Sequence, residues 1–142
     1  MKDLKNKYPE NLIFSYLNIN FIRNKLKDSE MILDGSVDVL TIAETKLDES
    51  FPSQQFLING FKRPFRLDNT DKSGGLLVYI KYDIPARPLN RLDINKSFEI
   101  FCIEINLRSK KCFFLSFYRN PKSNLNQYLD KLSEVIDFYS TS

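Results

Sequence analysis

The chain has 142 residues, the size of a single domain, and its 42% hydrophobic and 27% charged residues are typical of a folded globular protein. It contains no histidine, which excludes hydrolases built on a histidine base, and two cysteines without histidine exclude a thiolate–imidazole zinc site. The net charge of +3 neither indicates nor opposes binding to nucleic acid.

The chain begins with a polar leader. Residues 1–11 are mainly polar, so the folded domain is expected over residues 12–142. No apolar signal-peptide core follows Met1, and no apolar run reaches the length needed to cross a bilayer. We therefore expect an intracellular protein, nuclear or cytoplasmic, that does not associate with membranes.

The next part predicts a strand–helix–strand unit. Residues 12–17 are an apolar strand, and residues 22–33 place most of their apolar side chains on one helical face before Gly35 ends the helix. Residues 37–43 form a continuous apolar run, which predicts a strand buried on both faces. Considered alone, Glu44 is most simply explained as the first solvated residue after this strand.

The middle of the chain alternates short strands with loops. The expected elements are a loop over 45–60, an edge strand over 61–67 interrupted at Pro64, a polar turn over 68–75, a strand over 76–81 and a loop containing Pro85 and Pro88. The turn includes Ser73-Gly74-Gly75, which lacks the glycine spacing and the lysine of a phosphate-binding loop. We interpret it as a flexible turn.

A β-hairpin is predicted from residues 98–107 and 112–118, which are two apolar strands joined by a polar turn. Such a hairpin places Cys102 opposite residues 116–117, away from Cys112. A disulfide is therefore not expected, and both cysteines are interpreted as small buried apolar residues.

The clearest helical periodicity lies near the end of the chain. Asn124 is suited to cap the helix, with Gln127 three residues later. The resulting amphipathic helix is expected to cover a sheet. Its apolar positions are Leu125, Tyr128, Leu129, Leu132, Val135, Ile136 and Tyr139.

Polar side chains follow three of the predicted strands. If the strands lie side by side, these residues converge at one edge, where a carboxylate and amide oxygens suit a cation such as Mg²⁺. Tyrosine, lysine and arginine there could bind a phosphate group. The three segments are Asn18-Ile19-Asn20, Glu44-Thr45-Lys46 and Tyr118-Arg119-Asn120-Pro121.

Four segments in this order resemble the endonuclease/exonuclease/phosphatase superfamily, which includes DNase I and apurinic/apyrimidinic endonucleases. Within it, they resemble most the endonuclease domain of non-LTR (jockey-like, LINE-type) retrotransposon polyproteins, over nearly the whole chain. The segments are 16–25 (YLNINFIRNK), 43–48 (AETKLD), 74–80 (GGLLVYI) and 118–121 (YRNP). One departure is Phe21, which stands where the family frequently has a small residue.

The resemblance implies a four-layer α/β sandwich and roles for particular residues. Glu44 would bind Mg²⁺ (or Mn²⁺) with Asn20 beside it, while Asn18 and Tyr118 would act on the scissile phosphate of DNA. Lys46 and Arg119 are further candidates for contact with phosphate or DNA. The implied reaction is in-line attack of water on a phosphodiester, with the metal stabilising the developing charge.

Two family motifs are absent from the sequence. A Gly-Asp-x-Asn motif is expected after the last helix and a Ser-Asp-His motif near the family's C-terminus, and neither occurs here. We therefore interpret the chain as the N-terminal part of the domain, a partial DNase I-like sandwich without its C-terminal strands, expected to be inactive alone and to bind metal weakly or not at all.

Three alternatives remain open at this point. The chain could be a non-catalytic module, derived from that domain, that binds nucleic acid or protein. It could also be another phosphoesterase of the superfamily, acting on phospholipid or nucleotide phosphates. The third alternative is an unrelated small α/β domain.

Overall fold

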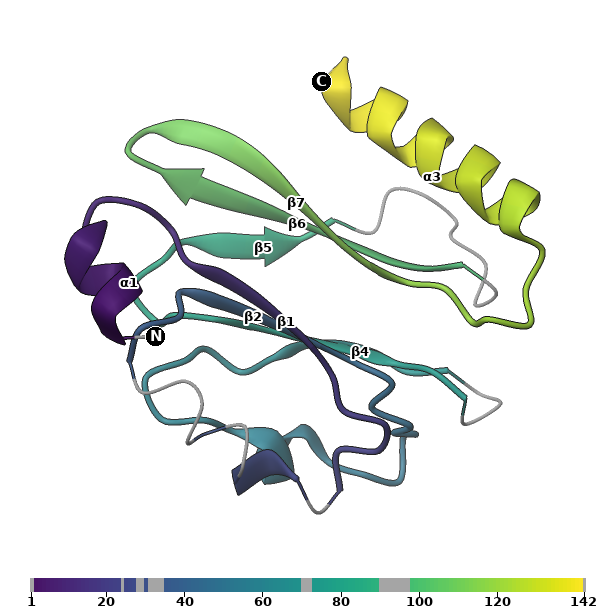
Figure 1. The fold of residues 1–142 in the computed structure, drawn as a ribbon, viewed down its shortest axis with the longest axis horizontal. Helices are drawn as coiled ribbons and strands as arrows, with labels where there is room; N and C mark the ends of the chain where they lie inside the picture. The colour runs from purple at the N-terminus through teal and green to yellow at the C-terminus, as the bar shows by residue number, and fades with distance from the viewer. Residues whose placement is uncertain are drawn as a thin grey trace.

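The computed structural model describes residues 2–23, 25–27, 30, 35–69, 73–89 and 98–141. Within them the strands form two sheets, with strand orders β1-β2-β4-β3 and β5-β6-β7 (Figure 1). Half of the predicted helix over 22–33, residues 24, 28, 29 and 31–33, lies outside the described residues. The elements are α1 (Lys2–Lys7), β1 (Phe14–Asn18), β2 (Val39–Ala43), the 3-10 helix η1 (Ser53–Phe56), β3 (Phe65–Leu67), β4 (Leu76–Ile80), β5 (Ala86–Pro88), β6 (Glu99–Leu107), β7 (Lys110–Tyr118) and α3 (Leu125–Ser140).

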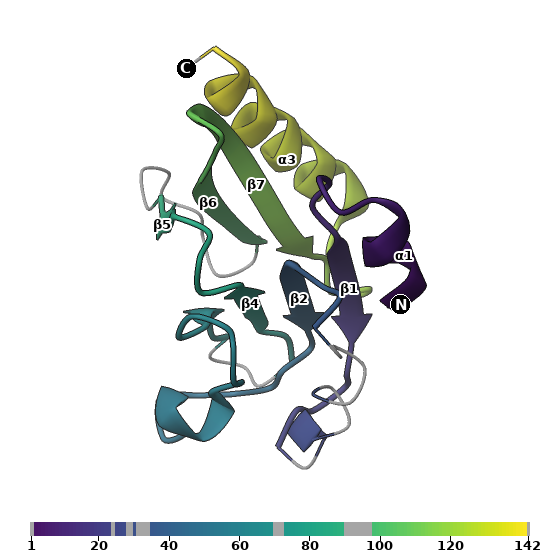
Figure 2. The ribbon, with the colours of Figure 1, turned by 90° about the vertical axis from the view of Figure 1, so that its left-hand side faces the viewer.

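The two sheets pack face to face, and each has a covered outer face (Figures 1 and 2). Between the sheets lies an aliphatic core that includes Val39, Val78 and Ile103. The segments after β1 and β2, with η1, cover the outer face of the four-stranded sheet, and α3 covers the three-stranded sheet. The result is the layered α/β sandwich that was predicted.

The strand β2 is the buried centre of the four-stranded sheet. It runs parallel to β1 and antiparallel to β4, and all five of its residues are buried. Leu40 and Ile42 face the outer core, while Val39 faces the core between the sheets. The predicted strand with two buried faces is confirmed.

The C-terminal helix is also confirmed. The Asn124 side chain accepts a hydrogen bond from the backbone amide of Gln127 at 3.1 Å, which caps α3 as expected. Val135 and Tyr139 pack on Ile100 and Cys102 of β6. Among the described residues, no helix has the length and apolar character needed to cross a membrane.

The hairpin forms with a different register from the predicted one. Its turn has two residues, Arg108 and Ser109, both at positive φ (47° and 66°). Cys102 therefore lies opposite Leu115, not opposite residues 116–117. Both cysteines are free, as expected, but the prediction that Cys112 is buried was wrong, because it lies exposed on the edge strand β7.

The predicted loop around Pro85 and Pro88 contains a strand. Residues 86–88 form β5, which pairs antiparallel with β6. The prediction was wrong because β5 is an edge strand, where a proline removes no hydrogen bond from the interior of the sheet. By contrast, the edge strand predicted over 61–67 is confirmed over its last three residues, which form β3.

The polar leader, for which no helix or strand was predicted, contains the helix α1. Lys5 on this helix forms an ion pair with Asp38 at 2.7 Å. The same buried carboxylate accepts a hydrogen bond from the amide of Ile13 at 2.8 Å and pairs with Lys81 at 3.2 Å. Asp38 thus ties α1 to β1 and β4, at the opposite end of β2 from Glu44.

We expect Asp38→Asn to lower the free energy of unfolding at pH 7 by roughly 1–3 kcal/mol, as for hydrogen bonds to a charged group. Burial alone would raise the pKa of Asp38, but the hydrogen bonds from Lys5, Ile13 and Lys81 outweigh it and lower the pKa below its ordinary 3.8. The native state therefore favours the ionised form, so this stabilisation is present above pH 3.8 and is lost as the pH falls through the lower, folded-state pKa.

Urea titrations of both proteins between pH 7 and pH 2 measure this effect. The difference between wild type and Asp38→Asn should shrink as the pH falls below about 4. A difference that stays constant with pH would contradict the assigned role of the carboxylate.

Candidate active site

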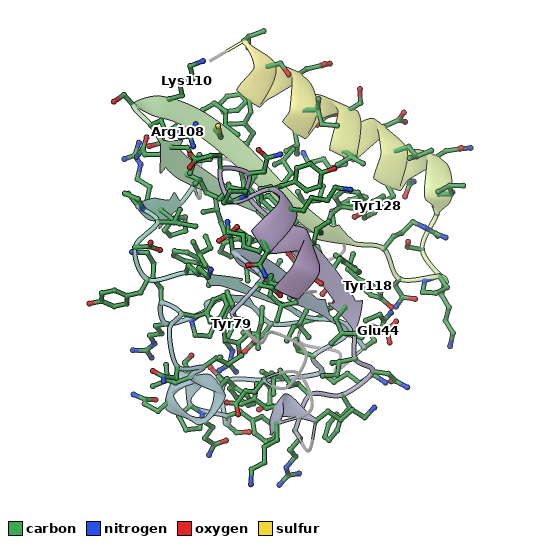
Figure 3. The ribbon with its side chains drawn as sticks, turned by 60° about the vertical axis from the view of Figure 1, so that its left-hand side comes forward. Glu44, Tyr79, Arg108, Lys110, Tyr118 and Tyr128 are labelled. Carbon is green, nitrogen blue, oxygen red and sulfur yellow. The ribbon has the colours of Figure 1, made fainter. Side chains whose placement is uncertain are left out.

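Glu44 lies where β2 leaves its sheet, and the ends of β1 and β7 meet it there (Figure 3). The hydroxyl of Tyr118 donates a hydrogen bond to Glu44 Oε1 at 2.6 Å, across the two sheets. The Asn18 side chain also lies close enough to the Glu44 carboxylate to lower its pKa. Three different strand ends therefore bring three predicted site residues together.

The backbone around Glu44 is held in an uncommon conformation. Glu44 and Lys46 have φ of 55° and 53°, and in the adjoining loop Asn20 and Phe21 have φ of 46° and 86°. The two segments are joined by a hydrogen bond from the Phe21 amide to the Glu44 carbonyl at 2.8 Å. Left-handed non-glycine residues are costly, and they persist only where surrounding contacts enforce them, which is frequent at functional sites.

Phe21 illustrates this cost. The resemblance identified it as standing where a small residue is frequent, and its φ of 86° lies in a region that glycine enters freely. Phe21 therefore adopts a positive φ that is unfavourable for a residue with a side chain. The loop retains its connection to β2 through this hydrogen bond and that from the Ile22 amide to the Thr45 carbonyl at 3.3 Å.

The electrostatics of the site favour an ionised Glu44 beside a protonated Tyr118. The hydrogen bond from Tyr118, the nearby Asn18 side chain and the charge of Lys46 lower the pKa of Glu44 even though burial opposes them. Burial, the hydrogen bond to Glu44 and the charges of Glu44 and Glu99 raise the pKa of Tyr118. At neutral pH the tyrosine is therefore a donor to a carboxylate.

The other predicted residues lie around this contact with different roles. Lys46 Nζ donates a hydrogen bond to Asn20 Oδ1, so these two residues form a pair beside Glu44. Arg119 is directed to the turn after β7, where its guanidinium donates to the carbonyl of Ser123 at 3.1 Å. In the described structure the Arg119 guanidinium therefore binds this turn.

The donor set suits a cation that keeps most of its own water. Glu44 is partly exposed and ionised, which fits Mg²⁺ held through one carboxylate. Among the described residues, no group of three or more acidic, histidine or cysteine side chains could hold a metal ion. Asn20 could contribute its amide oxygen only by releasing Lys46.

Three residues near the site, Glu99, Tyr16 and Tyr128, were not among the predicted site residues. Glu99, at the start of β6, is buried and lies opposite Tyr118 in the β6–β7 ladder. Burial is the largest cause of the raised pKa values of Tyr16 and Tyr128. The charge of Glu99 raises both further, after that of Glu44 for Tyr16, and the pKa of Tyr128 reaches about 12. The sequence signal that could have identified Glu99 is its position as an acid inside the apolar run at 98–103.

We expect Tyr118→Phe to raise the pKa of Glu44 towards its ordinary value of 4.5, because the largest cause of the lowered pKa is removed. The Glu44 carboxyl carbon can be followed by NMR during a pH titration. Tyr16→Phe is the matched control, since the Tyr16 hydroxyl donates to the Phe117 carbonyl. Equal shifts in both variants, or none in Tyr118→Phe, would contradict this assignment.

Comparison with known proteins connects this geometry to a fold. No family model and no curated protein matches the chain. Among solved structures, it is similar to the endonuclease domain of TRAS1, a telomere-specific non-LTR retrotransposon, with a TM-score of 0.57 and 17% sequence identity. The similarity covers 84% of this chain and 51% of that one, so the chain spans about half the length of the TRAS1 domain. The chain therefore shares its α/β fold with part of that endonuclease domain.

Proposed function

We propose that this chain is the N-terminal part of a Mg²⁺-dependent DNA endonuclease domain from a retrotransposon-derived protein. The observation that carries the proposal is the contact of Glu44 with Tyr118 and Asn18 at the ends of three strands, on an endonuclease-like fold. An ionised carboxylate, a neutral phenol and an amide are groups that can bind a metal ion and a phosphate oxygen.

Each residue then has a role in the complete domain. Glu44, with Asn20 released from Lys46, would hold the Mg²⁺, which supplies charge stabilisation for phosphodiester hydrolysis. Asn18, and Tyr118 once its hydroxyl turns from Glu44 to the substrate, would orient the scissile phosphate of DNA by donating hydrogen bonds to its oxygens. Lys46 would supply positive charge towards the DNA backbone.

The chain alone is expected to lack activity. It contains no histidine, and it has neither the Gly-Asp-x-Asn nor the Ser-Asp-His motif that the resemblance requires. Glu44 would therefore be a metal ligand in an incomplete site, which lacks the general base and the orienting acid of the complete domain. The half-length match to TRAS1 supports this interpretation.

The sheet edges also support a partial domain. β3 and β5 are short, at three residues each, and proline precedes or ends them, which protects an edge from pairing. β1 and β7 have five and nine residues without proline, and they lie on the same side of the sandwich (Figure 2). We propose that the rest of the endonuclease domain pairs with these two edges.

The space between the β1 and β7 edges is an apolar groove lined by aromatic side chains. A groove of about 510 Å³ runs between β1 and β7. Phe14, Tyr16 and Phe117 beside it are 51%, 54% and 44% exposed. Large exposed aromatic side chains on neighbouring strands indicate a surface that another segment normally covers.

A plasmid-nicking assay tests the proposed activity. Supercoiled DNA incubated with the purified chain and Mg²⁺ or Mn²⁺ should show no more open circles than with Glu44→Ala, because the chain supplies only part of the site. Robust nicking that Glu44→Ala abolishes would show that the chain is a complete enzyme. It would contradict the proposed inactivity while confirming the role of Glu44.

A second candidate is a non-catalytic DNA-binding module, favoured by a site that retains its phosphate-facing groups without the catalytic motifs. Gel shifts at increasing salt measure it. Affinity that falls steeply with salt, and that is weakened by Lys46→Ala without any nicking, would support binding as the surviving function.

A further inference from the structure

Glu99 is a buried carboxylate that is bound to the backbone of a glycine turn. It is 3% exposed, and its Oε1 accepts a hydrogen bond from the amide of Gly75. A Cβ on Gly74 would lie 2.1 Å from Glu99 Oε2, so the carboxylate occupies the space that any other residue would fill. Burying an ionised group is costly, and backbone hydrogen bonds offset that cost.

The other side of the same turn holds the segment that carries Glu44. The carbonyl of Gly74 accepts from the Lys46 amide at 2.7 Å, and that of Gly75 accepts from the Thr45 amide at 3.4 Å. A Cβ built on Gly75 would lie 2.2 Å from Thr45 Oγ1, so the threonine side chain fills the space beside this glycine. The turn is therefore packed between Glu99 and residues 45–46.

The left-handed residues Glu44 and Lys46 require contacts of this kind. Their φ values of 55° and 53° are unfavourable for residues with a Cβ, and they flank Thr45, which the turn binds directly. Glu99 also lies opposite Tyr118 in the β6–β7 ladder. Glu99 is thus connected to Glu44 through the glycine turn and Thr45, and to Tyr118 through the pairing of β6 with β7.

We propose that Glu99 is a positioning residue: through the Gly74–Gly75 turn, its carboxylate fixes the strained segment 44–46 and so directs the Glu44 carboxylate towards Tyr118. The functional meaning of this rests on the proposed role of Glu44. Glu99 acts as a hydrogen-bond acceptor, so Glu99→Gln should keep the segment 44–46 in place and Glu99→Ala should not.

The test measures amide hydrogen exchange by NMR in the 142-residue chain. In Glu99→Ala, exchange at Thr45 and Lys46 should rise about tenfold relative to core amides of β4, the effect of losing one ordinary hydrogen bond. Glu99→Gln should remain close to wild type. Glu104→Gln is the matched control, because Glu104 is a second buried acid of β6, paired with Arg87 on the neighbouring strand.

Gly74→Ala approaches the same contact from the other side. It should accelerate exchange at Thr45 and Lys46 by displacing the carboxylate, yet add little in a Glu99→Ala background, where the space is free. If Glu99→Ala does not fold, Glu99→Gln and Gly74→Ala still decide the question. Unchanged exchange in Gly74→Ala, glutamine behaving as alanine, or equal effects of Glu104→Gln would overturn the inference.

Mn²⁺ binding, followed by paramagnetic broadening, adds a functional measurement. Glu99→Ala should weaken Mn²⁺ binding several-fold, while Glu99→Gln retains it and Glu44→Gln removes it. If wild type binds no Mn²⁺, as is expected of a partial site, the metal-binding role of Glu44 is decided only in the complete domain, and the exchange data alone test Glu99. If Glu44→Gln removes binding and Glu99→Ala leaves it unchanged, the positioning role fails alone.

Discussion

Truncating Tyr79 to alanine is expected to lower the free energy of unfolding by about 3–5 kcal/mol, the range for removing a buried aromatic ring. Tyr79 lies on β4 and is fully buried in the outer core of the four-stranded sheet. Its ring meets Phe61 edge-on at 6.3 Å, and its hydroxyl donates to the carbonyl of Phe56 at 2.7 Å. The substitution removes packing and leaves that carbonyl without its donor.

Tyr79→Phe separates the two contributions. It keeps the ring but removes the hydroxyl, so the Phe56 carbonyl alone loses its partner, at a cost of about 1–2 kcal/mol. Urea-induced unfolding, followed by circular dichroism, measures both variants. An alanine variant no less stable than the phenylalanine variant would show that the ring contributes little, contrary to its burial.

The second large effect is expected at the candidate site. Gly75→Ala should cost about 2–5 kcal/mol, because it combines backbone strain with steric overlap. Gly75 has a φ of 104°, and an added Cβ would lie 2.2 Å from Thr45 Oγ1. Relief of the overlap requires Thr45 to move, which displaces its neighbour Glu44 from Tyr118.

Gly60→Ala is the control for strain alone. Gly60 has a φ of 87°, yet nothing lies within 4 Å of a Cβ built there. Its cost should stay near 1 kcal/mol, the lower end for a strained residue. If the two alanine variants lose equal stability in urea, the overlap with Thr45 is absent in solution. Adding Thr45→Ala to Gly75→Ala should restore part of the loss.

Local pattern explains which elements were predicted correctly. The strands β2, β4 and β6 and the helix α3 follow from continuous or periodic apolar residues, and Asn124 marks the start of α3. Each of these signals lies within the element itself. The face-to-face packing then follows, because every sheet and helix must bury its apolar side.

Other features depend on residues distant in sequence. The hairpin register depended on whether the turn had two residues, and β5 forms because β6 offers it an edge. The contacts of the Gly74–Gly75 turn come from Glu99 and from Thr45, which lie 24 and 30 positions from Gly75. No local pattern contains such contacts.

The sequence by itself determined the candidate residues, since the Asn-x-Asn, Glu-Thr-Lys and Tyr-Arg-Asn-Pro segments occur in the order in which the resemblance places them. Only the tertiary structure decided which of them meet. Tyr118 reaches Glu44 across 74 positions of sequence because their strands belong to facing sheets, while Arg119, one residue later, points to its own turn. Contact between strand ends is a property of how sheets pack, and packing involves the whole chain at once.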